Sequence, residues 1–166
     1  MPAADAPLPT VPTADLERGA LPSPFDVRVT RALDEALPAD AALEVAIVAM
    51  GKLPSINRRI QVRRDGGVYS VRRKPGGDWQ VPFDQPLPAK ASAKVAPAIV
   101  DDWVAQLERA GFFDHPGYEA NRRTQDGTFW IVRARRGGAV HAVVFQNTRP
   151  PAIEAVIAAV EASAPG

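Results

Sequence analysis

The chain of 166 residues contains no cysteine and only two histidines. Without cysteine it can form neither disulfides nor thiolate metal sites, and it has no cysteine nucleophile. The two imidazoles, His115 and His141, stand alone, and no HExxH or similar spacing of metal ligands occurs. We therefore expect no metal site and no cofactor.

Long hydrophobic runs are also missing. No segment approaches the roughly 18 consecutive apolar residues that a membrane-spanning helix needs, so we expect a soluble chain that does not enter a membrane. The first ten residues, MPAADAPLPT, lack the basic and apolar regions of a signal peptide. This favours a cytoplasmic location, although a chain without cysteine also fits other compartments, and the compartment stays open.

Signatures of catalysis are scarce. No GxSxG nucleophile motif is present, and none of the Gly-Gly pairs is followed by the helix that a phosphate-binding loop requires. Asp114 and His115 are neighbours in a Pro-Gly loop, which is typical of a turn. Asp101 and Asp102 are adjacent in a predicted helix, where neighbouring side chains point in different directions. We therefore expect that the protein is not an enzyme.

The composition is that of a globular domain with an uneven charge distribution. Hydrophobic residues make up 46% and charged residues 23% of the chain. Residues 1–45 hold eight acidic and three basic residues, whereas the remainder holds 11 acidic and 17 basic. Opposite potentials attract over about 8–10 Å at physiological salt, so an acidic arm resting near a basic domain is one hypothesis. Chance variation in composition is the alternative.

The beginning of the chain divides into a tail and an extension. Residues 1–24 carry six prolines without a hydrophobic period, which predicts a flexible tail. The rest, residues 25–166, is predicted to be a single domain with an extension at 25–57 and a core at 58–163. Apolar residues four apart over 25–37 predict a short helix that ends before Pro38. The apolar run LEVAIVAM, residues 43–50, predicts a strand buried on both faces, and a helix is the rival interpretation.

A first hairpin is predicted at RRDGGVYSVRR, residues 63–73. An Asp65–Gly66 loop of two residues favours a type I′ turn, and that turn fixes the register of the flanking strands. The predicted pairs are Val62 with Tyr69, Ile60 with Val71, and Arg59 with Arg72. This register places an apolar set on one face and arginines on the other.

The second half contains a helix, a hairpin and a closing helix. The first helix is predicted to begin at Pro97 and to end before Gly111, with an apolar stripe of Ile99, Trp103, Leu107 and Ala110. In the hairpin TFWIVRARRGGAVHAVVFQ, a Gly137–Gly138 turn pairs Trp130 with Phe145, Val132 with Val143, and Ala134 with His141. The closing helix runs from Pro150 or Pro151 to about Ala162, with Thr148 as its N-cap and Ile153, Ile157 and Val160 facing inward.

These elements predict an α+β fold. Two hairpins supply an antiparallel sheet of four to five strands, and two to three helices cover one face of it. If the hairpins are neighbours, their arginines form a basic face that could bind an anion or a nucleic acid. The candidates for that face are Arg59, Arg63, Arg72, Arg73, Arg133 and Arg135. A solvated face without a ligand is the alternative, because no basic recognition helix is evident.

The segments from about residue 59 to 160 resemble the emfourin family, small bacterial protein inhibitors of thermolysin-like metallopeptidases. The similarity lies in RRDGGVYSVRR, in a helix that ends at LERAGFFD, in the strand QDGTFWIVRA, in the Gly-Gly turn, in HAVVFQN and in a Pro-led final helix. It covers about three fifths of the chain. The resemblance implies an α+β fold and a non-enzymatic inhibitory role, with a metallopeptidase as the protein partner.

Such an inhibitor presents exposed loops to a protease from a rigid sheet. The loops expected to do so are the two hairpin tips and the loop 115–126. The residues expected to contact the partner are Asp65, Gly66, Gly67, His115, Tyr118, Asp126, Arg136 and Gly137. Two other functions stay open, namely binding of anions or nucleic acids through the arginines, and a role as an accessory domain of a larger assembly.

Overall fold

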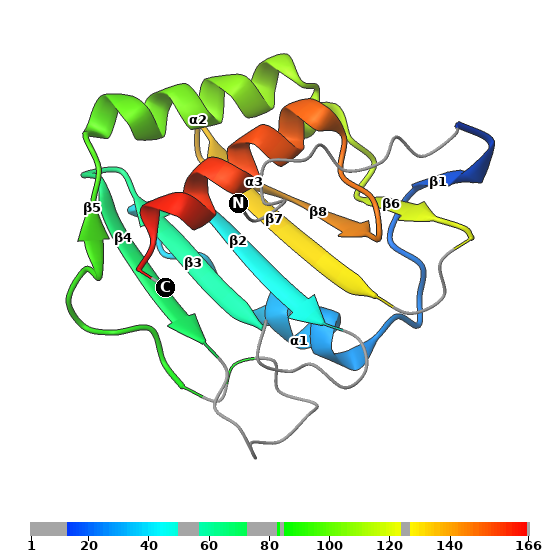
Figure 1. The fold of residues 1–166 in the computed structure, drawn as a ribbon, viewed down its shortest axis with the longest axis horizontal. Helices are drawn as coiled ribbons and strands as arrows, with labels where there is room; N and C mark the ends of the chain where they lie inside the picture. Colours follow the sequence, from blue (N-terminus) through cyan, green and yellow to red (C-terminus); the bar gives the residue numbers. More distant parts are fainter. Residues whose placement is uncertain (1–12, 50–56, 73–82, 84, 124–126, 166) are drawn as a thin grey trace, which may run out of the picture.

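The computed structural model describes residues 13–49, 57–72, 83, 85–123 and 127–165. Within them, one sheet of eight strands is covered by helices (Figure 1). The strands are β1 (Leu16–Gly19), β2 (Ala41–Ala49), β3 (Arg58–Arg63), β4 (Gly67–Arg72), β5 (Ala93–Lys94), β6 (Tyr118–Asn121), β7 (Thr128–Arg136) and β8 (Ala139–Gln146). The helices are α1 (Val27–Asp34), α2 (Pro97–Arg109) and α3 (Pro151–Ser163), and the short 3₁₀ turns are η2 (Thr13–Asp15) and η4 (Phe112–Asp114).

The strand order is β1-β6-β8-β7-β2-β3-β4-β5, and β6 and β8 are parallel while the other neighbours are antiparallel. The α+β class is confirmed, but the prediction of four to five antiparallel strands is wrong. The three additional strands, β1, β5 and β6, have only two to four residues each. Such short segments are too brief to develop a period-two alternation, so their pairing depends on neighbours that are distant in sequence. The tail predicted for residues 1–24 is therefore wrong for β1, which pairs with β6.

Strand β2 is the centre of the sheet. All nine of its residues are buried, and it pairs with β3 on one side and β7 on the other. A strand with neighbours on both sides and helices over both faces has no solvent-exposed side, which explains its nearly continuous apolar sequence. The strand predicted from LEVAIVAM is thus confirmed, and its last residue, Met50, lies outside the described residues.

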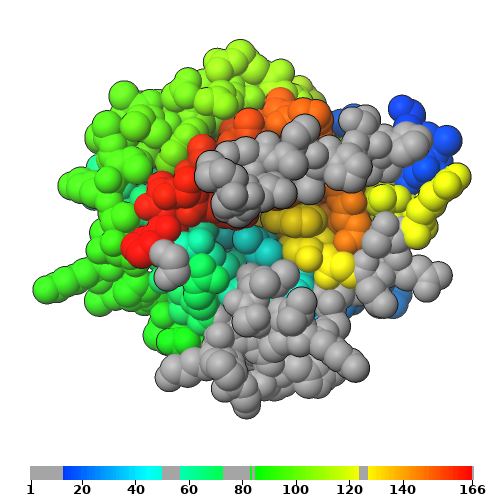
Figure 2. Space-filling model, viewed as in Figure 1, coloured from blue at the N-terminus to red at the C-terminus, as the bar shows by residue number. Residues whose placement is uncertain are grey.

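Helices lie on both faces of the sheet, so the prediction that they share one face is wrong. Helices α2 and α3 lie side by side on the first face (Figures 1 and 2), where their residues Trp103, Leu107 and Ile157 join the larger hydrophobic core. Helix α1 covers the opposite face, where Val29 packs with Ala46 and other residues of a second core. Successive side chains of β2 point alternately into these two cores. Each face of the sheet is therefore apolar and needs its own covering helix.

The two hairpins differ in how well the sequence predicts them. The β7–β8 register is confirmed, including Trp130 opposite Phe145. The β3–β4 register is one residue away from the prediction, and Val62 pairs with Val68. The Gly66 N–H donates to the Arg63 carbonyl at 3.0 Å, so the loop has three residues instead of two. A shift of one residue moves each side chain of β4 to the opposite face.

The helices begin and end close to their predicted positions. Gly111 has φ +78°, the left-handed conformation expected just after α2. However, Ile99 is 44% exposed, and Val100 takes its place in the buried stripe. Thr148 does not cap α3, because Pro150 occupies the N-cap position and no side chain accepts a hydrogen bond there.

Candidate functional site

A buried ion network joins three strands on the α1 face of the sheet. The carboxylate of Glu44 is 2% exposed and accepts hydrogen bonds from Arg59 (2.8 Å), Gln61 (3.0 Å) and Arg133 (2.7 Å). Arg59 also contacts the Glu35 carboxylate at 2.7 Å, and Arg133 donates to the Glu35 carbonyl. Burial lowers the pKa of Arg59, but the attraction and hydrogen bonds of Glu44 and Glu35 outweigh this effect and raise the pKa above its ordinary value. We call these five residues the Glu44 network.

The Glu44 network and its surroundings change the interpretation of the predicted basic face. Arg59 and Arg133 are buried and paired, so they cannot contact an external anion. Arg135 donates to the carbonyls of Leu37, Pro38 and Ala41, and Arg63 forms an ion pair with Asp40 at 2.7 Å. Arg72 is exposed, and Arg73 lies outside the described residues. The prediction of a continuous face of free arginines is therefore wrong. Of its members that the structure describes, only Arg72 is exposed.

The charge asymmetry has a structural explanation in these contacts. Acidic residues of the first 45 form ion pairs with arginines of the later, basic part of the chain. The pairs are Glu35 with Arg59, Glu44 with Arg59 and Arg133, Asp40 with Arg63, and Asp15 with Arg123. The two oppositely charged parts thus contact each other within one fold.

The β3–β4 hairpin tip is held against the segment that leads into α2. Asp65 is exposed, and its carboxylate accepts the N–H of Gly67 at 2.8 Å. Gly66 and Gly67 are buried, and the Gly66 carbonyl accepts the N–H of Val95 at 2.9 Å. All three residues were predicted to contact a partner, but only Asp65 is exposed.

The β7–β8 tip projects further from the fold. Arg136 and Gly137 are both exposed. The Arg136 guanidinium lies 4.8 Å from the centre of the Phe113 ring and 3.5 Å from the Glu108 carboxylate. Because β3 and β7 are both antiparallel to β2, the two hairpin tips lie at the same end of the sheet.

Two other predicted contact residues, His115 and Tyr118, do not join the tips. His115 is buried and faces the same side of the sheet as α2 and α3. Tyr118 is buried in the second core on the opposite face, and its hydroxyl donates to Gln146 at 2.6 Å. Asp126 lies outside the described residues.

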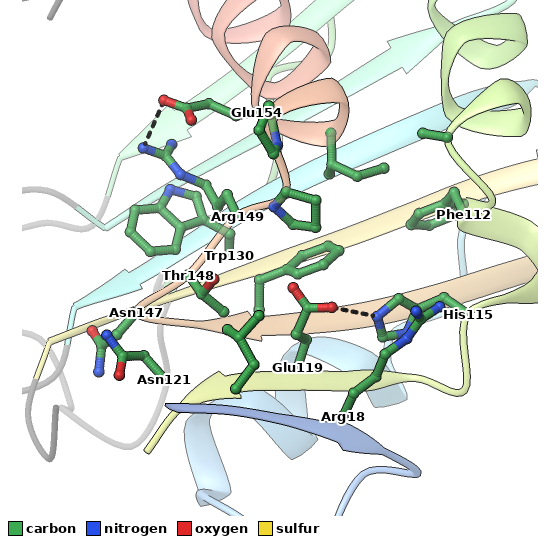
Figure 3. A pocket seen from close by; sticks show the side chains of 16 residues that line it. Arg18, Phe112, His115, Glu119, Asn121, Trp130, Asn147, Thr148, Arg149 and Glu154 are labelled. Carbon is green, nitrogen blue, oxygen red and sulfur yellow. Dashed lines mark hydrogen bonds and ion pairs between the residues drawn. The ribbon is translucent and has the colours of Figure 1, made fainter. Parts of the chain in front are cut away.

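A cleft of about 670 Å³ lies beside β1 and β6 (Figure 3), the strands that extend the sheet beyond α2 and α3 (Figure 1). Its apolar walls include Leu16, Phe112, Trp130, Phe145 and Ile153. Several polar side chains from β1, β6 and the β8–α3 connection also line it. A concave, largely apolar cavity with a few convergent polar groups is typical of a ligand site.

One wall of the cleft is a buried histidine–glutamate pair. His115 Nδ1 accepts the N–H of Gly117 at 3.0 Å, so this nitrogen carries no proton. The ring is therefore neutral, and its Nε2–H points to Glu119 Oε1 at 3.3 Å. His141 Nε2 donates to the His115 carbonyl at 2.8 Å and holds the backbone of this loop to β8. The contacts orient Glu119 without giving it a positively charged partner.

The opposite wall contains a stacked arginine. The Arg149 guanidinium lies 4.2 Å from the centre of the Trp130 ring and 3.6 Å from the Glu154 carboxylate. Burial lowers the pKa of Arg149, and the nearby charges of Glu154 and Glu161 offset only part of that effect. The positive charge of Arg149 is thus engaged by an aromatic face and a carboxylate.

Sequence reasoning missed this cleft. Glu119 and Arg149 carry no recognisable motif, and Trp130 was assigned only to the hairpin core. The floor of the cleft depends on β1 and β6, and each of these strands has only four residues, too few for a clear alternating pattern. Among the described residues, no group of three His, Cys, Asp or Glu could hold a metal ion, and no helix is long and apolar enough to cross a membrane.

No protein-family model matches the chain, and a search of curated proteins returns no significant match.

Proposed function

We propose that this chain is a non-catalytic protein-binding domain that inhibits a thermolysin-like metallopeptidase. The target class rests on the resemblance of RRDGGVYSVRR, LERAGFFD and HAVVFQN to the emfourin family. The observation that carries the binding role is the β7–β8 tip, where residues 136–140 are all exposed. Val140 is 42% exposed, an apolar side chain presented beside a tight turn. Strand β7 pairs with β8 as far as Arg136 and with β2 as far as Ala134, so the tip is preorganised and loses little conformational entropy on binding.

Titration of a thermolysin-like peptidase with the intact protein tests this proposal. We expect peptidase activity to fall in proportion to added protein and to vanish near one equivalent, because a preorganised interface forms a stoichiometric complex. Electrophoresis should show the added chain uncleaved at the end point. Absence of inhibition across several peptidases of this class, or loss of activity only while the chain is being digested as a substrate, contradicts the proposal.

The contribution of the tip can be measured with a matched pair of variants. Val140→Asp is expected to weaken inhibition about tenfold or more, since a charge replaces an apolar contact at the interface. Val27→Asp is the control, because Val27 is 38% exposed and lies at the start of α1. Its neighbour Arg28 donates to the carbonyl of Ala49 at 3.0 Å, which places this control at the end of the sheet opposite to the tip. Equal effects of the two variants would exclude the tip as the contact surface.

A further inference from the structure

The cleft contains a carboxylate that lacks a counter-charge. Glu119 is 6% exposed, and Oε1 accepts a hydrogen bond from the neutral ring of His115. Within the described chain no other donor lies within hydrogen-bond distance of this carboxylate, and no arginine or lysine lies within ion-pair distance. Figure 3 shows the carboxylate directed into the cleft. A largely buried carboxylate without a counter-charge is costly, so a ligand that supplies a positive charge here would bind favourably.

The other charges of the cleft leave this position available. Arg149 and Glu154 contact each other at 3.6 Å in the opposite wall. Arg18 is the β1 residue directly opposite Glu119 in the strand pairing, but it is exposed and forms no ion pair with it. The interior therefore presents one unmatched negative charge, while Arg18 stands at the solvent-exposed rim.

The apolar walls determine what kind of cation fits. Phe112, Phe145 and Trp130 line the cleft together with Leu16 and Ile153. The Phe145 ring lies 5.6 Å from the His115 ring, so aromatic surface reaches the neighbourhood of the carboxylate. Aromatic faces and a carboxylate together favour an organic cation over a hydrated metal ion, because the apolar part of the ligand can be buried while its charge is neutralised. The cavity volume is in the range of small-molecule sites.

We propose that the cleft binds a protonated primary amine carried on an apolar body, with Glu119 as its counter-charge. A small-molecule amine and the lysine side chain of a polypeptide share this chemistry. The site lies on the part of the sheet formed by β1, β6 and the start of β7, whereas the inhibitory surface proposed above is the β7–β8 tip. The two proposals can therefore be tested independently of each other.

Calorimetric titration with 2-phenylethylamine and with 2-phenylethanol tests the proposal, because the two probes share an apolar body and differ in charge. We expect the amine to bind about tenfold or more tightly than the alcohol at neutral pH, since only the amine can neutralise Glu119. Glu119→Gln keeps an acceptor for His115, so it is expected to fold and to abolish the preference for the amine. Glu17→Gln is the matched control, because Glu17 lies in the same strand pair but alternates to the opposite face. It is expected to retain the preference.

Equal affinity for the amine and the alcohol in the unmodified protein overturns the proposal. So does a preference for the amine that survives in Glu119→Gln. A third titration, with a lysine-containing peptide, identifies the source of the amine. Tighter binding of the peptide than of 2-phenylethylamine supports a polypeptide ligand, and weaker binding supports a small-molecule amine. None of these titrations contains a peptidase, so a negative result here leaves the outcome of the inhibition assay unaffected.

Discussion

Replacement of Glu44 by alanine is expected to destabilise the fold by about 3–5 kcal/mol, because it leaves two arginines buried without a counter-charge. Arg59 and Arg133 are 5% and 4% exposed, so water cannot replace the missing carboxylate. Both arginines also lie on strands that flank β2, and their repulsion would act directly across the centre of the sheet. For a chain of this size such a loss corresponds to a decrease in Tm of roughly 6–20 °C. Unfolding in urea, followed by tryptophan fluorescence and circular dichroism, measures it.

Asp40→Ala is the matched control for the Glu44 substitution. It also removes a carboxylate bonded to an arginine, but the Asp40 side chain is 66% exposed and its partner Arg63 can be solvated instead. We expect this surface pair to contribute less than about 1 kcal/mol. A Glu44→Ala variant that loses no more stability than Asp40→Ala would show that the buried arginines find other partners.

A triple variant separates the destabilisation caused by unpaired buried charge from the stability that the ion network itself contributes. Glu44→Leu combined with Arg59→Met and Arg133→Met removes all the charges that meet at the centre of the network. Because apolar replacements avoid the desolvation of all three ions, we expect the triple variant to recover most of the stability lost by Glu44→Ala. If it is as unstable as Glu44→Ala, the ion network stabilises the fold beyond what apolar side chains of similar size can supply.

The Glu44 network also marks the limit of what the sequence predicts. A single glutamate within LEVAIVAM indicates a buried charge that needs a partner, but it does not identify that partner. Arg59 and Arg133 become its partners because β3 and β7 flank β2 in a particular register. The arginines were interpreted as a basic face because the hairpins were treated as neighbours, whereas β2 is inserted between them.

Local sequence signals performed best where a turn determines the register. The Gly137–Gly138 loop fixes the β7–β8 pairing, and each predicted pair is confirmed. In the β3–β4 hairpin the turn residues Asp65 and Gly66 were recognised, but the loop contains one more residue than predicted. Two- and three-residue loops share the Asp-Gly signal, and the choice between them depends on which face of the hairpin is buried.

The cleft could not be predicted because its floor is built from non-local pairings. Strand β1 lies about a hundred residues before its partner β6 and carries no alternating pattern. Strand β6 pairs in parallel with β8, and a parallel pair has no connecting turn from which it could be predicted. The spatial relation between Arg18 and Glu119 therefore appears only in the folded structure, although each residue is ordinary in the sequence.

Replacement of Gly66 by alanine is expected to cost about 3–4 kcal/mol, because a left-handed backbone and a backbone clash coincide there. Gly66 has φ +93°, and a Cβ atom at this position would lie 1.9 Å from the carbonyl oxygen of Val95. Relief of the clash requires the 93–97 segment to move, which breaks the hydrogen bond from the Val95 N–H to the Gly66 carbonyl. The pairing of β5 with β4 and the start of α2 would be disturbed with it. Thermal unfolding gives the total cost, and faster hydrogen exchange at the Val95 amide would locate it.

Gly137→Ala separates the two contributions, because Gly137 occupies the other hairpin tip at the same end of the sheet. Its φ is +61°, also left-handed, but no atom lies within 4 Å of a Cβ built there. Only the conformational penalty applies, so we expect a loss of about 1–2 kcal/mol. The difference between the two alanine variants then measures how firmly the β3–β4 tip is fixed to the segment before α2. Equal losses would mean that this segment moves aside freely, and that the anchoring of the first tip contributes little to the stability of the sheet.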